Sequence, residues 1–351
     1  MSGHDFHAAL HRVDVGSTSI PHVDIGKLTE LFEASASNVD QTGIIAKEQF
    51  DALAAAGLYG TFAPTSLGGL ELTLGQMCDV VEQLAAASLS PTFVWMQHFR
   101  LLAALMDPTT PDDLRAMLPH AVRGELKGGV ALGGLLPGPA RLRAVHSEEG
   151  WILEGNAPWV SGWGIVDVLF VTARGPDETV ISCILDARDQ PGLKVTPHLL
   201  SALNATATVR LDFEGLLVNP DRFVSEQPYA PGQEGREGLR VNGSLALGLT
   251  RRCCALLGPS SLDDDLDECR KELDDADVEA MPVARARANL LAVRAAQLLS
   301  VQRGSQAALA GDIAERTSRE ASLLLVFGSR PSIKRALLDL LAFSATGATT
   351  R

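Results

Sequence analysis

The sequence lacks any long run of apolar residues. No stretch approaches the roughly 20 consecutive apolar residues of a membrane-spanning helix, and the first residues, MSGHDFHAALHRVDVG, lack the apolar core of a signal peptide. Aromatic residues are scarce at 5%, whereas hydrophobic residues make up 46% of the chain and charged residues 21%. This composition is typical of a soluble, helix-rich protein, which we expect in the cytoplasm and not at a membrane.

Metal-binding and disulfide patterns are also missing. The five cysteines are odd in number and never spaced as CxxC, and the histidines form no cluster of ligand spacing. We therefore expect reduced, buried thiols and no metal ion. The formal net charge of -13 argues against nucleic acid as a partner, because a polyanion would be repelled.

The dinucleotide fingerprint GxGxxG between a strand and a helix is absent as well. Gly133, Gly134 and Gly138 lie in a loop between two predicted strands, which argues against a Rossmann domain. Instead, apolar residues recur at helical spacing from about Asp24 to His120, including a predicted helix over 93–106. Short, β-branched, alternating segments fill about 125–224.

Long alanine-rich amphipathic segments follow a Pro- and Gly-rich linker over 227–238. The acidic run over 263–277 is predicted to be a solvated helix face or loop. We therefore predict an α+β fold, in which consecutive short strands without intervening helices form an antiparallel barrel or sandwich. The predicted domains are an N-terminal helical domain (1–122), a central β domain (123–226) and a C-terminal bundle of long helices (227–351).

Several segments resemble the acyl-CoA dehydrogenase family. They are AGLYGTFAPTSLGGLELTLGQMCDVVEQLAAAS (56–88), GWILEGNAPWVSGWGIVDVLFVTAR (150–174), ATATVRLDFEGLLVNPDRFV (205–224) and LALGLTRRCCALLG (245–258). The resemblance runs from about residue 24 to residue 345. It implies the three-part fold of that family, with FAD bound between the β domain and the C-terminal helices.

The resemblance also implies which residues hold the flavin. One loop comprises Ala131 with Leu132, Gly133, Gly134 and Leu135, and the other comprises Trp159, Val160 and Ser161. Backbone N–H groups and a hydroxyl can bond the polar edge and N5 of an isoalloxazine, and an indole supplies an apolar wall. The alternative is that Trp159 is a buried strand aromatic and Ser161 begins a turn. Small residues in 74–88 and 243–248 would shape a slot for an acyl chain.

The chain departs from the family pattern at the catalytic base. A carboxylate must reach the proton alpha to the thioester carbonyl, but the late segment LLDLLAFSATGATTR contains only Asp339, inside a predicted helix. At the family's other base position the alignment gives Gly238, next to Glu237. Glu237 is therefore the candidate base, and its alternative interpretation is an exposed linker charge.

The chain also departs at the family's cofactor-phosphate motif. The acidic run replaces an Arg-x-x-Phe-Gly motif, and Arg270 lies nearby without the Phe-Gly. Near the end, VFGSRPSIKR resembles members in which residues corresponding to Gly328 and Arg330 lie near a neighbouring subunit's cofactor. Arg330 could instead interact with a helix C-terminus. His98 could face the active-site cavity or be an ordinary core or surface histidine.

Three functions remain open from the sequence. The first is an FAD-dependent dehydrogenase that acts on an acyl thioester, carried by coenzyme A or by an acyl carrier protein, as a homo-oligomeric dimer or tetramer. The second is a catalytically incomplete subunit of a hetero-oligomer, in which a homologue supplies the missing groups. The third is a flavin-dependent monooxygenase of the same fold, which needs no alpha-proton base.

Overall fold

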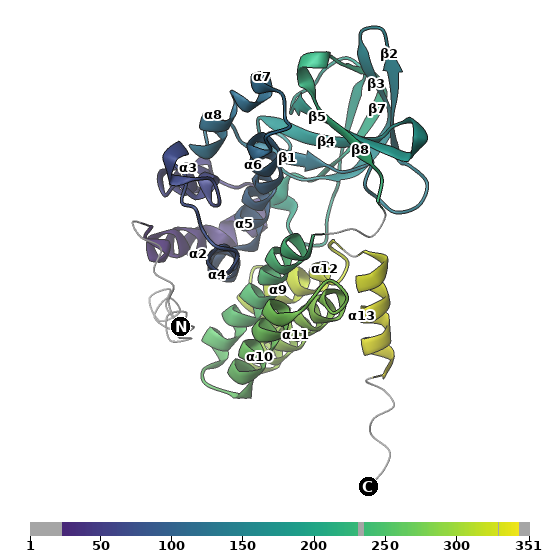
Figure 1. The fold of residues 1–351 in the computed structure, drawn as a ribbon. Helices are drawn as coiled ribbons and strands as arrows, with labels where there is room; N and C mark the ends of the chain where they lie inside the picture. Colours follow the sequence, from purple (N-terminus) through teal and green to yellow (C-terminus); the bar gives the residue numbers. More distant parts are fainter. Residues whose placement is uncertain (1–22, 231–234, 329, 344–351) are drawn as a thin grey trace.

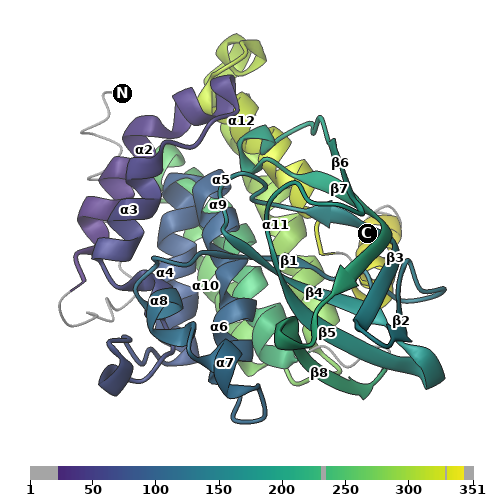
Figure 2. The same cartoon turned by 90° about the horizontal axis from the view of Figure 1, so that it is seen from above.

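The computed structural model describes residues 23–230, 235–328 and 330–343. Figure 1 shows the first helices beside a twisted sheet, with the C-terminal helices running beneath both. The view from above in Figure 2 shows α4, α5 and the start of the sheet lying over the C-terminal helices. The order of helices, sheet and helices confirms the α+β class and the three-part architecture.

The first helices begin and end where local sequence signals place them. They are α2 (Ile25–Thr42), α3 (Lys47–Ala55), α4 (Leu74–Ala87), α5 (Leu89–Met96), α6 (His98–Met106), α7 (Asp112–Arg115) and α8 (Leu118–Val122). Asp24 accepts a hydrogen bond from the Lys27 amide at 3.1 Å and caps α2. Thr73 and Gln76 form a reciprocal capping box at the start of α4.

The helix expected over 93–106 is two helices. α5 already begins at Leu89, and the helix is interrupted at Gln97. The Gln97 amide bonds the Val94 carbonyl at 3.2 Å, and its side chain donates to the Phe93 carbonyl at 2.9 Å. A polar side chain that bonds the preceding turn competes with the regular helical ladder. The interruption therefore has a local cause.

The central part is one eight-stranded sheet. Its strands are β1 (Gly128–Ala131), β2 (Leu142–Ser147), β3 (Gly150–Val160), β4 (Val168–Arg174), β5 (Thr179–Asp186), β6 (Leu193–Pro197), β7 (Val209–Val218) and β8 (Phe223–Pro228). The strand order is β6-β7-β3-β2-β4-β5-β8, and β1 pairs with β4. Most pairs are antiparallel, as expected.

The expectation of a purely antiparallel sheet is wrong in one respect. β1 pairs with β4 in parallel, from Gly128 opposite Val168 to Ala131 opposite Val171, and β2 makes one parallel bridge to β4. Between β1 and β4 the chain makes the β2–β3 hairpin, so it returns to β4 in the same direction as β1. Local alternation reveals strands but not such a non-local pairing.

The C-terminal part consists of α9 (Arg236–Leu257), α10 (Ser261–Asp275), α11 (Met281–Arg303), α12 (Ile313–Leu324) and α13 (Pro331–Phe343). The acidic run lies mostly on α10, which turns Leu262, Leu266 and Leu273 inward. All five cysteines are free and buried, as expected. Within the described ranges, no helix is long and apolar enough to cross a membrane.

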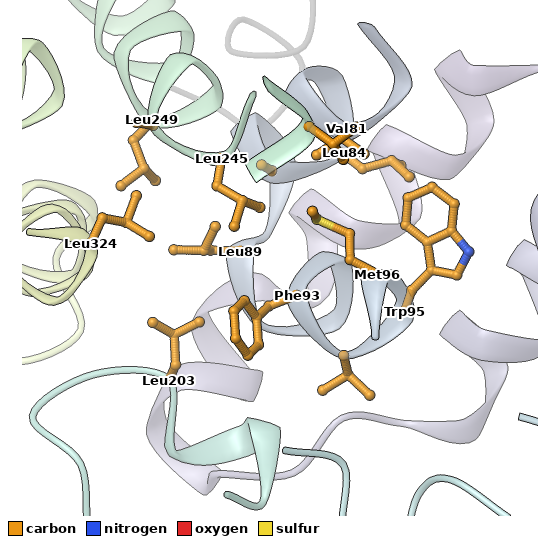
Figure 3. Packing of buried hydrophobic residues seen from close by; sticks show 14 of the residues in the cluster. Val81, Leu84, Leu89, Phe93, Trp95, Met96, Leu203, Leu245, Leu249 and Leu324 are labelled. Carbon is orange, nitrogen blue, oxygen red and sulfur yellow. The ribbon is translucent and has the colours of Figure 1, made fainter. Parts of the chain in front are cut away.

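The two helical parts come into close contact where α4 crosses α9. A side chain at Gly248 would place its Cβ 2.6 Å from the Glu82 carbonyl oxygen and 2.7 Å from the Ala85 Cβ. The two backbones approach this closely only because Gly248 has no side chain. Around the crossing, buried side chains from α4, α5, α9 and α12 interlock, among them Leu84, Leu89 and Leu245 (Figure 3).

Replacing this glycine tests the crossing. We expect Gly248→Ala to destabilise the protein by about 1–3 kcal/mol, because its methyl group overlaps the backbone of α4. Gly238→Ala on the same helix is the matched control, since its Cβ would meet nothing within 4 Å. That control should be neutral or stabilising by up to about 1 kcal/mol. Urea unfolding of both variants measures the difference, and equal midpoints would contradict the close-contact argument.

Glu33 gives a prediction on pH. Partial burial on α2 raises its pKa to about 7, against the opposing effect of Arg252 and Arg316 and with some help from Glu30. A carboxyl with a raised folded-state pKa holds a proton that the unfolded chain has lost, so its contribution to stability is present below about pH 4.5 and declines as the pH rises towards 7.

Glu33→Gln should therefore gain stability relative to the wild type as the pH rises from 5 to about 8. Glu148 is an exposed carboxyl in the β2–β3 turn. The difference in stability between Glu148→Gln and the wild type should therefore stay constant over this pH range. Thermal unfolding across this pH range is the measurement. A Glu33→Gln profile parallel to the wild type would refute the assigned shift.

Candidate functional site

A β-bulge near the end of β3 directs Trp159 outwards. Ala157 pairs with Leu211 and Val160 with Val209, so β3 has one more residue than β7 between these pairs. Pro158, which has no N–H to offer a ladder, occupies this bulge. Trp159 is 63% exposed, which excludes the alternative of a buried strand aromatic, while Val160 is fully buried in the core.

His198 supports the exposed indole. Its ring centroid lies 4.6 Å from that of Trp159, with the two planes inclined by 33°. Its Nε2 donates to the Pro158 carbonyl oxygen at 2.8 Å, which fixes the ring against the bulge. Trp159 and His198 thus form a supported aromatic surface near the end of strand β3.

A row of three buried hydroxyls begins two residues after Trp159. Ser161 Oγ lies 2.7 Å from Thr208 Oγ1, which lies 2.8 Å from Thr206 Oγ1. Thr206 Oγ1 in turn donates to the Leu203 carbonyl oxygen at 2.8 Å. All three hydroxyl residues are buried, and Ser161 is the most accessible at 8%.

The turn that carries these threonines has an uncommon backbone. Leu203 has φ 61° and Ala207 has φ 46°, a left-handed conformation that non-glycine residues rarely adopt. Surrounding bonds hold it: the Gly162 amide donates to the Thr206 carbonyl at 2.7 Å, and Trp163 donates to Ala207 at 3.3 Å. Such residues persist only where neighbouring structure holds them, and they cluster at functional sites.

The loop that follows β1 is hydrogen-bonded to strand β4 of the sheet. Gly134 donates to the Thr172 carbonyl at 2.7 Å, and Leu135 donates to the Leu132 carbonyl at 3.2 Å. A Cβ on Gly134 would lie 2.5 Å from the Ala173 backbone, and one on Gly133 would lie 2.7 Å from the Leu142 Cβ. Both glycines are thus required by packing, and the amides of Gly134 and Leu135 already have acceptors.

Arg174 fixes the same loop. Its guanidinium donates from Nε and Nη2 to the Gly134 carbonyl at 3.2 and 3.1 Å, and from Nη1 to Glu178 at 2.6 Å. The guanidinium carbon of Arg174 lies 3.2 Å from the centroid of the Tyr229 ring. Neither Arg174 nor the pair Thr206 and Thr208 was assigned a site role from the sequence. The only local signal was the alternation ATAT at 205–208.

The small residues expected to line an acyl slot do not do so where α4 crosses α9. Gly248 contacts the backbone of α4 at Glu82–Ala86, and Gly243 faces Leu273 of α10. The neighbouring interior is filled by Leu84, Leu89, Phe93, Met96 and Leu245, as Figure 3 shows. The small side chains serve helix packing, because only they allow this close approach.

Glu237, the candidate base, lies exposed in the first turn of α9. Within the described ranges the buried carboxylates are Glu82 and Glu320. Arg270 binds both oxygens of Glu82, at 2.7 and 3.1 Å, and Arg252 binds Glu320 at 2.5 Å. Both buried carboxylates are therefore engaged by arginines within the helical parts of the chain.

The remaining sequence-predicted residues lie elsewhere. Gly328 is exposed, with φ 56°, and Arg330 directly precedes α13. Phe327 packs edge-on against Phe93 at 4.5 Å between ring centroids. His98 is fully buried and accepts a 3.0 Å hydrogen bond from the Gly128 amide, while burial lowers its pKa to about 3. It is a neutral core histidine.

Comparison with known proteins supports one family. Residues 28–125 match the family described as acyl-CoA dehydrogenase, N-terminal domain. The chain is 30% identical over 230 residues to an L-evernosamine nitrososynthase of Micromonospora sp., covering 62% of this chain and 54% of that protein. The chain thus spans about half the length of that curated relative.

Solved structures share the fold over almost the whole chain. Butyryl-CoA dehydrogenase from Megasphaera elsdenii superposes with a TM-score of 0.77 at 15% identity, covering 97% of this chain and 98% of that one. Dibenzothiophene monooxygenase from Paenibacillus sp. A11-2 gives 0.71 at 16% identity, covering 96% and 98%, and was also solved with FMN and indole. The domain match and the common fold together show that this chain has the acyl-CoA dehydrogenase fold, with a first domain that matches the N-terminal domain of that family.

Proposed function

We propose that the protein is a flavin-dependent oxidoreductase and that its reaction is oxygenation by reduced flavin. The observation that carries the proposal is the exposed indole of Trp159 beside the Ser161 hydroxyl at the end of β3. An apolar aromatic wall next to a single hydroxyl suits the flat ring of an isoalloxazine and its N5 atom. Named relatives of the same fold include both dehydrogenases and a monooxygenase.

The residues present fit a flavin. Trp159, supported by His198, would cover one part of the ring, and Ser161 would bond N5. In the loop 132–135 the amides of Gly134 and Leu135 are already used, so Leu132 and Gly133 would make the backbone contacts to the ring's polar edge. A bound reduced flavin would supply the two electrons that allow dioxygen to give one oxygen atom to the substrate and the other to water.

The carboxylates favour oxygenation over α,β-dehydrogenation. Dehydrogenation requires a base at the alpha proton, but Glu82 and Glu320 are held by arginines and Glu237 is exposed. Oxygenation by reduced flavin requires no such base. We therefore propose that Glu237 is not the group on which the reaction depends, and that an acyl-CoA or acyl carrier protein is not an obligatory substrate.

Arg270 bears on the choice between FAD and FMN. Its guanidinium is bound to Glu82 and, at 2.6 Å, to Asp267. It is thus engaged within its own subunit and is not free to hold a cofactor pyrophosphate across an interface. We propose that FAD and FMN bind with similar affinity, because the flavin ring is the part that the described residues recognise. A homo-oligomer, with Gly328 and Arg330 near a neighbouring cofactor, remains a prediction.

Flavin binding tests this proposal directly. We expect the purified protein to bind FMN and FAD, and Trp159→Ala to weaken binding about 10-fold, because it removes one aromatic wall. Trp159→Phe should retain most of the affinity, and Leu199→Ala, an exposed neighbour of the site, should retain all of it. Equilibrium dialysis of each variant gives the dissociation constants.

Anaerobic mixing with acyl-CoA thioesters then separates the reactions. Loss of the yellow colour of bound flavin would show dehydrogenation and contradict the oxygenase proposal. Retained colour, together with oxygen uptake when reduced flavin and a substrate are supplied, would support it. A protein that binds neither FMN nor FAD in either redox state would instead favour the incomplete subunit of a hetero-oligomer.

A further inference from the structure

We propose that Thr206 and Thr208 hold Ser161 as a hydrogen-bond acceptor, so that the site binds reduced flavin more tightly than oxidised flavin. This inference rests on the proposed flavin site and adds a redox preference to it. The two threonines are positioning residues, since they act through Ser161.

The direction of the hydroxyl row follows from its last member. The Leu203 carbonyl oxygen can only accept, so the Thr206 hydroxyl proton is committed to that 2.8 Å bond. Thr206 Oγ1 must then be the acceptor in its 2.8 Å contact with Thr208, which commits the Thr208 proton. Thr208 Oγ1 in turn accepts from Ser161 at 2.7 Å, which commits the Ser161 proton.

Ser161 is therefore left with lone pairs only. A ligand atom that reaches it must donate a proton if a hydrogen bond is to form. The N5 atom of reduced flavin carries a hydrogen, whereas N5 of oxidised flavin has a lone pair and would face the lone pairs of Ser161. To donate to oxidised flavin, Ser161 would have to give up its bond to Thr208.

Because the three hydroxyls are buried, losing a hydrogen bond between them is costly. Thr206 and Thr208 are 1% and 6% exposed, so water does not readily replace a broken bond between Thr206 and Thr208 or between Thr208 and Ser161. An unmade hydrogen bond in a buried position costs more than the net gain from forming one. The left-handed turn at Leu203 and Ala207 keeps the accepting carbonyl in place. The hydroxyl protons of the row therefore keep pointing from Ser161 towards Leu203.

The midpoint potential of bound FMN tests the inference. Tighter binding of the reduced form raises this potential above that of free FMN, and we expect a preference of about 10-fold, or about 30 mV for a two-electron couple. Thr208→Val frees Ser161 to donate and should return the potential towards the free value. Thr206→Val should do the same, since it removes the fixed end of the row.

Thr61→Val is the matched control. Thr61 is a buried threonine in the first helical part, its hydroxyl has no hydrogen-bond partner in the described part of the chain, and its replacement should leave the potential unchanged. A wild-type potential at or below that of free FMN would overturn the inference, whatever the variants do. So would an unshifted potential in Thr208→Val that still binds FMN. Failure to bind FMN in either state would overturn the proposed function itself.

Discussion

The packing of the helical parts depends on the buried guanidinium of Arg252. From α9 it donates to the Ala85 and Ala86 carbonyls at the end of α4, to the Thr317 hydroxyl and to Glu320 of α12. The side chain is completely inaccessible to solvent. A cation at a helix C-terminus satisfies carbonyls that have no helical partner, and Glu320 neutralises its charge. Because a buried charge with one partner removed is costly, the three helices are joined as one unit.

The candidate site lies where this helical unit meets the sheet, and the sheet shapes it by local irregularities. The bulge in β3 turns Trp159 outwards, and the left-handed turn before β7 brings two threonines to Ser161. Arg174 and two close-packed glycines hold the neighbouring loop. Each of these features departs from regular strand geometry, and departures of this kind are common near functional sites.

The sequence predicted the fold well because periodicity and turn residues act locally. The helical spacing of apolar residues over 24–120 and the alternation of buried and more exposed positions in β2 and β7 follow such rules. It predicted less of the site. The parallel pairing of β1 with β4, the exposure of Trp159 and the partners of Arg270 depend on segments far apart in the chain. No local pattern of residues encodes these pairings, so the resemblance could name Ser161 but not the hydroxyls behind it.

The crossing at Gly248 has a consequence for internal motion. With backbone against backbone and no flexible side chain between them, α4 and α9 cannot slide past one another without breaking contact. The parts of the chain before and after the sheet are therefore fixed to each other at this crossing, and a shift of α9 here is passed directly to the backbone of α4.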